Sequence, residues 1–241
     1  MEERTTTQTT EEKIPVSEIF FSIQGEGIYA GTPSVFVRTY RCNLTCTWCD
    51  TKYTWLGQDR ARPGVEYTEM SVAAALEAIS GLGCKHVVLT GGEPLLHQRA
   101  LEPLISALKE SGCFIEVETN GTIAPSPQVA RLVDSFNVSP KISNSQVPEA
   151  ARLRPDSLGA FVRSGKAWFK FVVCNEGDVA EVEGVISRIG IPRERVLLMP
   201  EGTDPSTILK RGQWLVDVCK EREFRFAPRL HILLYGNARG T

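Results

Sequence analysis

The sequence has no apolar run that approaches the roughly 20 residues of a membrane-spanning helix. Its first 13 residues are rich in threonine and glutamate and have no apolar core of the kind a secretory signal carries, so we expect a cytoplasmic protein. The net charge is only −2, which gives no general attraction to nucleic acid. With 42% hydrophobic and 23% charged residues, the 241-residue chain has the composition of a globular enzyme.

A fourth cysteine is missing beside three that lie close together. Cys42, Cys46 and Cys49 fall within eight residues. A closed structural zinc site needs four ligands, and an electron-transfer cluster usually has four thiolates. Three thiolates can instead hold three irons of a 4Fe–4S cluster and leave the fourth iron open to a small molecule.

The total of seven cysteines is odd, and the chain is too long for a small disulfide scaffold. We expect the four others to be packing residues, since free cysteine behaves as a small buried hydrophobe. These are Cys84, Cys113, Cys174 and Cys219.

Two other interpretations of the cysteine cluster stay open on the residues alone. The first is a zinc knuckle completed by a distant ligand, for which the chain offers His86, His97 or His231. No second pair of cysteines accompanies the cluster, and these three histidines are isolated in the sequence. The second is an iron–sulfur or zinc binding module without catalytic activity.

Strand-like and helix-like segments alternate along the chain, which predicts an α/β fold with a parallel sheet. We predict strands at 16–23, 34–39, 86–90, 114–118, 136–139, 168–173, 196–199 and 224–226. We predict helices at 72–79, 101–108, 180–189 and 205–219, the last with Asp204 as N-cap and Pro205 as its first residue. Residues 1–13 are predicted to be a disordered tail, and 14–241 a single domain.

Several predicted strands run into polar or glycine-rich segments. Thr90-Gly91-Gly92-Glu93-Pro94 follows one strand, and Glu118-Thr119-Asn120-Gly121 follows the next. Two later strands run into Ser139-Pro140-Lys141 and Met199-Pro200-Glu201-Gly202. In parallel α/β folds, ligands bind at the carboxyl ends of strands. We therefore expect these segments to line one site.

The C-x3-C-x2-C spacing, followed one βα unit later by Gly-Gly-Glu-Pro, resembles the radical S-adenosylmethionine superfamily. The resemblance implies an incomplete (β/α) TIM-like barrel and a 4Fe–4S cluster bound by Cys42, Cys46 and Cys49. It also implies that the open iron binds S-adenosylmethionine, which one electron cleaves to a 5′-deoxyadenosyl radical. The residues that it places at the cofactor are Trp48, Asp50, Gly91, Gly92, Glu93, Glu118, Ser139, Pro140 and Lys141.

A narrower resemblance rests on Gln24-Gly25-Glu26-Gly27, on Cys49-Asp50-Thr51 and on the final segment 230–241. Together these are similar to the 7-carboxy-7-deazaguanine synthase family, from Val16 to Thr241. That family contracts the ring of 6-carboxy-5,6,7,8-tetrahydropterin to 7-carboxy-7-deazaguanine with loss of ammonia, on the route to queuosine. The resemblance further implies assistance by Mg2+, a homodimer, and a reductant such as flavodoxin or ferredoxin.

The resemblance and the chemistry of a pterin together suggest which residues bind the substrate. Carboxylate and carbonyl groups suit the donor edge of the ring, and a guanidinium suits the substrate carboxylate. The expected substrate residues are Gln24, Gly25, Glu26, Arg38, Thr90 and the terminal carboxylate of Thr241. Thr51 is the expected Mg2+ ligand.

A radical activating enzyme, which modifies a partner protein, is the alternative within the superfamily. That alternative explains the cysteines but not the Gln-Gly-Glu-Gly segment. Residues 143–165 match no motif.

Overall fold

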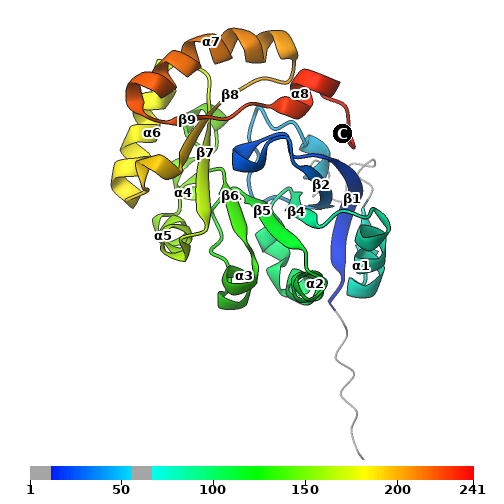
Figure 1. Cartoon of the computed structure of the whole chain (residues 1–241). Helices are drawn as coiled ribbons and strands as arrows, with labels where there is room; N and C mark the ends of the chain where they lie inside the picture. The colour runs from blue at the N-terminus through cyan, green and yellow to red at the C-terminus, as the bar shows by residue number, and fades with distance from the viewer. Residues whose placement is uncertain (1–11, 56–66) are drawn as a thin grey trace, which may run out of the picture.

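The structure is a computed structural model that describes residues 12–55 and 67–241. Within that part of the chain, nine strands form one sheet in the order β3-β1-β2-β4-β5-β6-β7-β8-β9 (Figure 1). The strands are β1 Ile14–Ile23, β2 Pro33–Thr39, β3 Thr68–Met70, β4 His86–Gly91, β5 Phe114–Thr119, β6 Ser135–Val138, β7 Ala167–Val173, β8 Val196–Pro200 and β9 Arg225–Phe226. Most of the predicted tail, residues 1–11, lies outside the described residues.

From β2 through β4 to β9, every neighbouring pair of strands is parallel. The edge strands β3 and β9 are not neighbours, so the sheet curves without closing, which confirms the predicted incomplete barrel. Helices surround its outer face in Figure 1. They are α1 Val72–Gly81, α2 Gln98–Glu110, α3 Pro127–Leu132, α4 Glu149–Arg152, α5 Pro155–Ser164, α6 Glu176–Ile189, α7 Pro205–Arg222 and α8 Leu230–Tyr235.

The first strand departs from the expected parallel arrangement. β1 pairs with β2 antiparallel, and β3, which the sequence did not predict, pairs antiparallel with β1. The chain between β1 and β2 is too short for the dozen or more residues that a parallel crossover needs. It folds instead into a turn, in which Gln24 N donates to Thr32 O at 2.7 Å. This turn therefore lies at the end of the barrel opposite the carboxyl ends of the parallel strands.

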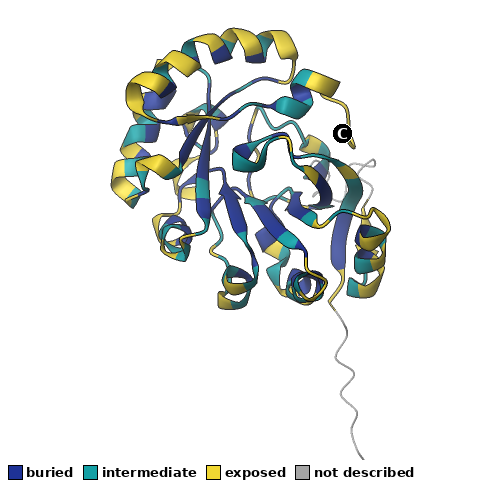
Figure 2. Cartoon of the chain, viewed as in Figure 1, coloured by how far each residue is buried: buried dark blue, intermediate teal, exposed yellow. Residues whose placement is uncertain are grey.

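The apolar core lies between the sheet and the helices. In α2, the predicted apolar positions Leu101, Leu104, Ile105 and Leu108 are all buried there. Figure 2 shows the same division, with dark blue strands and helices whose outer faces are yellow. A smaller cluster of Val172, Leu197, Met199 and Ala227, with Trp48 and Trp168 packed against it, forms separately.

Local sequence signals account for several helix boundaries. The Asp204 side chain accepts a hydrogen bond from Thr207 N, and α7 begins at Pro205, as predicted. The other predicted helices are confirmed as α1, α2 and α6. The stretch 143–165, which matched no motif, contains α4 and α5. No helix in the described ranges is long and apolar enough to cross a membrane.

Three of the four remaining cysteines pack as predicted. Cys113 and Cys219 are buried in the core, and Cys84 packs against it. Cys174 differs, because it belongs to none of the apolar clusters and its backbone N–H donates to the Asp178 carboxylate at 2.6 Å. Its place at the end of β7, where the strand meets α6, explains the polar surroundings.

Candidate active site

One pocket lies at the carboxyl ends of the parallel strands. It is lined by Thr90 near the end of β4, Glu118 near the end of β5, Ser139 after β6 and Glu201 after β8. β7 adds Lys170 and Val172. The four polar strand ends identified in the sequence therefore do share one site, as predicted.

Most of the predicted site residues line this pocket. They are Gln24, Gly25, Glu26, Arg38, Cys42, Cys46, Trp48, Cys49, Asp50, Thr51, Thr90, Gly91, Gly92, Glu118, Ser139, Lys141 and Thr241. Glu93 and Pro140 are not among the lining residues. Trp55, Asn137, Lys170 and Arg229 also line it and were not predicted as site residues, and His231, which lines it too, was considered only as a zinc ligand.

Glu93 is buried behind the pocket wall. Its carboxylate accepts hydrogen bonds from Thr119 Oγ1 at 2.8 Å, Asn120 N at 2.7 Å and Leu95 N at 3.0 Å. Burial raises the pKa of this carboxyl, while the three donors act in the opposite direction. Glu93 thus ties the loop after β4 to the end of β5, and its predicted contact with the cofactor stays a prediction.

Gly92 brings the loop after β4 against the cysteine loop. A Cβ atom at this position would lie 2.0 Å from Arg41 O and 2.7 Å from Cys42 N. The backbone of Glu93 also donates to Arg41 O at 2.8 Å. Only glycine permits this close approach, which fixes the first cysteine relative to the strand ends.

N–H donors face the cysteine sulfurs. Leu44 N donates to Cys42 Sγ at 3.4 Å, and Trp55 Nε1 donates to Cys49 Sγ at 3.3 Å. Such bonds stabilise a thiolate that binds a metal. Burial raises the pKa of Cys42 to about 11, so this thiol needs nearby positive charge to ionise.

The spacing of the sulfurs bears on the choice between zinc and a cluster. Among the described residues, Cys42, Cys46 and Cys49 do not form a group whose ligand atoms all lie within 4.8 Å of one another. A single tetrahedral zinc with bonds of about 2.3 Å would need the sulfurs roughly 4 Å apart. The three-thiol set therefore fits a larger iron–sulfur cluster better than one ion.

Two of the three candidate zinc histidines are engaged elsewhere. His86 Nε2 lies 3.1 Å from Glu116 Oε2, and His97 Nε2 lies 2.7 Å from Tyr40 O. Neither lines the pocket, whereas His231 does. His231 faces Glu26, with 4.0 Å between its Nε2 and Glu26 Oε1, rather than completing a cysteine site.

A buried charge network crosses the pocket. Lys170 Nζ binds Glu26 Oε2, and Arg229 Nε donates to Glu26 Oε1 at 2.9 Å. Arg229 Nη2 also binds Asp50. Burial alone would raise the pKa of Glu26, but the charges of Lys170 and Arg229 outweigh it and hold that pKa far below its ordinary 4.5. Glu26 is consequently a permanent anion.

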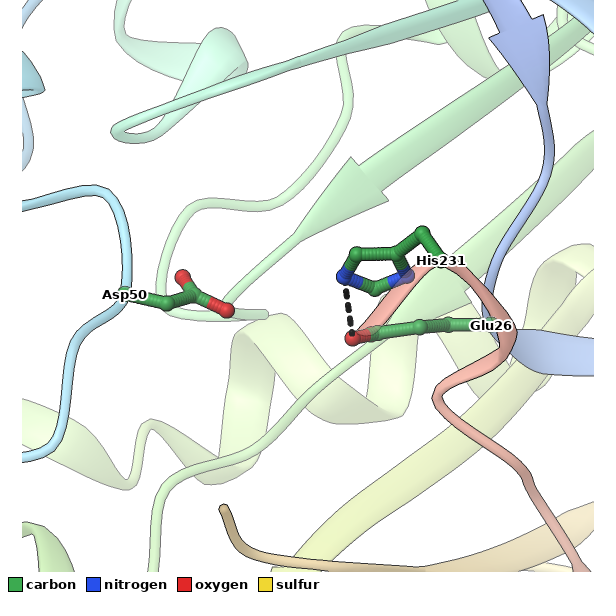
Figure 3. A group of neighbouring side chains, drawn as sticks. All are labelled: Glu26, Asp50 and His231. Carbon is green, nitrogen blue, oxygen red and sulfur yellow. Dashed lines mark ion pairs between the residues drawn. The ribbon is translucent and has the colours of Figure 1, made fainter. Parts of the chain in front are cut away.

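Glu26, Asp50 and His231 come together in Figure 3, where the dashed line joins Glu26 and His231. One ligand atom from each lies within 4.8 Å of the others, a geometry that could suggest a metal ion. The guanidinium of Arg229, however, already binds both carboxylates. The group is therefore an ion-pair network, because a cation would have to displace one already present.

Arg38 and Glu118 already have partners in the protein. Arg38 Nε donates to Glu18 Oε1 at 2.6 Å, and its guanidinium lies 5.7 Å from the centre of the Phe20 ring. Glu118 accepts from Gln24 Nε2 at 3.1 Å and from Thr90 Oγ1 at 2.8 Å. These contacts hold the side chains in place at the pocket wall and connect the turn after β1 with β4 and β5.

The C-terminal segment lies against the turn that follows β1. Leu230 N donates to Gly25 O at 2.8 Å, and Figure 1 shows this red segment crossing the open side of the sheet. Further along, Arg239 Nε donates to Glu18 Oε2 at 3.0 Å. These contacts bring Thr241 to the pocket. The apolar residues after His231 belong to α8, in which Ile232 is buried.

Comparison with known proteins agrees with this architecture. Residues 36–169 match the Radical SAM superfamily. The 7-carboxy-7-deazaguanine synthase of Pyrobaculum aerophilum is 46% identical over 229 residues, covering 95% of this chain and 97% of its own. That of Hyperthermus butylicus is 38% identical, covering 91% and 92%.

A solved structure is similar over nearly the whole fold. The crystal structure of QueE from Escherichia coli aligns with a TM-score of 0.69 and 26% identity, covering 89% of this chain and 93% of that one. The superfamily implies S-adenosylmethionine and a 4Fe–4S cluster, which the three-thiol loop fits. The chain belongs to the radical S-adenosylmethionine superfamily and, within it, to the 7-carboxy-7-deazaguanine synthase family.

Proposed function

We propose that the protein converts 6-carboxy-5,6,7,8-tetrahydropterin to 7-carboxy-7-deazaguanine and ammonia. The observation that carries the proposal is a single pocket that contains both the three-thiol loop and the buried turn at Gln24 and Glu26. A radical enzyme needs its substrate within reach of the cofactor, and this pocket provides both groups of residues in one enclosure. The relatives named 7-carboxy-7-deazaguanine synthase support the same product.

The cofactor side of the pocket is formed by the cysteine loop and the first strand ends. When bound, the cluster supplies the electron that cleaves S-adenosylmethionine. Cys42, Cys46 and Cys49 would hold it. Carbonyl groups at Gly91 and Gly92 would accept from the amino group of the methionine, and Lys141, 2.9 Å from Ser139 Oγ, would lie beside its carboxylate. Glu118, which also lines the pocket, would accept from the ribose hydroxyls of the cofactor.

The substrate side is formed by the turn after β1 and the C-terminal segment. Glu26 is held ionised by Lys170 and Arg229, so its carboxylate is an acceptor and not a donor, and its remaining lone pairs can accept from the donor edge of the pterin. Gln24, the Gly25 backbone and Thr90 add acceptors, and a carboxylate at Thr241 would complete them. Arg38, positioned by Glu18, would bind the substrate carboxylate.

We propose that Mg2+ assists the reaction and that Thr51 is its protein ligand. Thr51 lines the pocket next to the cysteines, with its Oγ1 3.6 Å from Cys49 Sγ. A hard cation that keeps water and substrate oxygens can bind through one such hydroxyl. The Glu26, Asp50 and His231 group does not suit this ion, because Arg229 neutralises both carboxylates.

An anaerobic assay tests the proposed reaction. Protein with reconstituted cluster, S-adenosylmethionine and dithionite should convert the pterin to 7-carboxy-7-deazaguanine, detected by mass, without any second protein. The alternative of a radical activating enzyme predicts cleavage of S-adenosylmethionine but no pterin turnover. A cluster with neither cleavage of S-adenosylmethionine nor turnover would indicate an iron–sulfur binding module, and bound zinc without a cluster would indicate a zinc module.

The proposed function also includes two protein partners, an electron donor and a second copy of this chain. A flavodoxin or ferredoxin would supply the electron, and replacing dithionite by each with its reductase would identify which supports turnover. We also propose a homodimer, since Phe21 on β1 and Leu234 and Tyr235 on α8 are exposed large apolar side chains. Sedimentation equilibrium of the holoenzyme would measure the mass directly.

A further inference from the structure

Asn137 is a buried polar residue with nothing in the described protein to bind. It lies on β6, is 3% exposed and lines the pocket. Neither its amide nitrogen nor its amide oxygen has a hydrogen-bond partner among the described residues. Buried side-chain amides are almost always hydrogen-bonded, so both groups point to a ligand or to a bound water.

The sheet register shows where this amide faces. Asn137 pairs with Glu118 on one side and with Trp168 on the other, and paired residues of parallel strands share a face. It therefore faces the interior of the barrel. It precedes Ser139 by two residues, which places it about 7 Å deeper than the residues proposed to bind the cofactor.

The turn after β1 closes the space beside this amide. A Cβ atom on Gly27 would lie 2.6 Å from Asn137 Nδ2, and Gly27 has φ +72. The polar neighbours satisfy one another: Glu118 accepts from Gln24 and Thr90, and Lys170 binds Glu26. No hydrogen bond joins Asn137 to any of them.

A carboxamide presents one donor and one acceptor side by side. The group that it matches in two hydrogen bonds is a ring edge with an N–H next to a C=O or ring nitrogen, as when asparagine binds a nucleobase. We infer that Asn137 is a specificity-determining residue that binds the ring amide of the pterin through both its amide groups. The inference rests on the proposed function, whose other residues account for the guanidine edge and the carboxylate.

Binding to unreduced holoenzyme tests this role without turnover. The dissociation constants of the carboxy-tetrahydropterin and of S-adenosylmethionine are measured by anaerobic calorimetry for wild type and Asn137→Val. Loss of two neutral hydrogen bonds should weaken pterin binding about 10- to 100-fold. S-adenosylmethionine binding and the cluster absorption should stay within twofold. Asn137→Thr, which keeps a hydroxyl, should show a smaller loss and serves if the valine variant folds poorly.

Two comparisons make the result specific. A pterin analogue with hydrogen in place of the C4 oxygen loses the carbonyl and the ring N–H together, so the advantage of wild type over Asn137→Val should be smaller for this analogue than for the pterin. Ser157 is also a buried hydroxyl without a hydrogen-bond partner among the described residues, but it does not line the pocket, so Ser157→Ala should leave both constants unchanged.

Equal pterin binding by wild type and Asn137→Val would overturn the inference and leave the proposed function intact. So would an equal loss of pterin and S-adenosylmethionine binding, which would indicate a general effect on the barrel. A wild-type holoenzyme that binds S-adenosylmethionine but no pterin would refute the proposed function, and the ligand assigned to Asn137 with it.

Discussion

Glu26 keeps its charge inside the barrel because two cations surround it. Its side chain is 13% exposed, and Lys170 and Arg229 are each 7% exposed. Removing one partner from a buried pair costs about 3–5 kcal/mol, because the remaining charge stays desolvated. We expect Glu26→Gln to lower the free energy of unfolding at pH 7 by this amount, measured by urea denaturation of the apoprotein. Glu149→Gln, which removes an exposed pair with Arg188, should change the free energy of unfolding little.

The difference in the free energy of unfolding between wild type and Glu26→Gln should depend on pH in one direction. The pKa of Glu26 is lowered in the folded protein, so its stabilising contribution is complete above the ordinary value of 4.5 and declines as the pH falls below it. Wild type and Glu26→Gln should therefore differ by a constant amount from pH 5 to 8. The difference should shrink below pH 4.5. A difference in the free energy of unfolding that grows as the pH falls below 4.5 would contradict the ion pairs assigned to Glu26.

The three loop cysteines should each be essential. Alanine at Cys42, Cys46 or Cys49 removes a cluster ligand, and we expect cleavage of S-adenosylmethionine to fall by at least about 100-fold after anaerobic reconstitution. Cys113→Ala is the matched control, a buried cysteine of the core that should cost only about 1 kcal/mol of stability. Wild-type cleavage by any loop variant would remove that residue from the site.

Thr51 can be tested separately from the cluster. Thr51→Ala removes one oxygen ligand, so the Mg2+ concentration for half-maximal turnover should rise about 10-fold while S-adenosylmethionine binding is kept. Thr45→Ala, in an exposed position of the same loop, should behave as wild type. If the curves of turnover against Mg2+ concentration are the same for Thr51→Ala and wild type, Thr51 is only a turn residue.

At the scale of single elements, the loop after β4 can pack against the cysteine loop only because residue 92 is a glycine. Gly92→Ala would force a Cβ atom against Arg41 O, so we expect the cluster content after reconstitution to fall severalfold, as measured by iron analysis. Gly184, an exposed position in α6, has no atom within 4 Å of such a Cβ. Gly184→Ala should therefore raise stability by about 0.5–1 kcal/mol and leave the cluster intact.

The elements with strong local signals were predictable. α2 and α7 combine apolar residues at helical spacing with recognisable ends, and the parallel strands end in polar segments. β3 has only three residues, and the six residues of α8 are mostly apolar, which does not distinguish a helix from a strand. β1 is antiparallel to β2 because the connection between them is too short for a parallel crossover, a constraint that alternation of strands and helices alone does not reveal.

The site was predictable where a motif contains its residues and not where it depends on distant pairs. The cysteine loop and the strand ends are local. Lys170 was missed, although a lysine between phenylalanines in an apolar strand indicates a polar face inside the barrel. Arg229 could not be assigned, since its partner Glu26 lies 203 positions away in the sequence.

At the scale of the whole molecule, the C-terminal segment lies against the first strand, where Arg239 Nε donates to Glu18 Oε2 on β1. An affinity tag after Thr241 should displace the segment that brings this residue to the pocket. We expect the Michaelis constant for the pterin to rise about 10-fold, the loss of one charge-assisted hydrogen bond. Cluster content and S-adenosylmethionine binding should not change. A tag before Met1 is the control, and equal constants for both proteins would exclude a role for the terminus.

The long separation between Glu26 and its partners also sets an order of events during synthesis. Lys170 leaves the ribosome 59 residues before Arg229, roughly 3 to 12 s at ordinary translation rates. Throughout that interval the cysteine loop and most parallel strands exist, but the segment that contacts Gly25 does not. The nascent barrel is thus open along one side while its thiols are already present, and the substrate pocket is the last part of the protein to form.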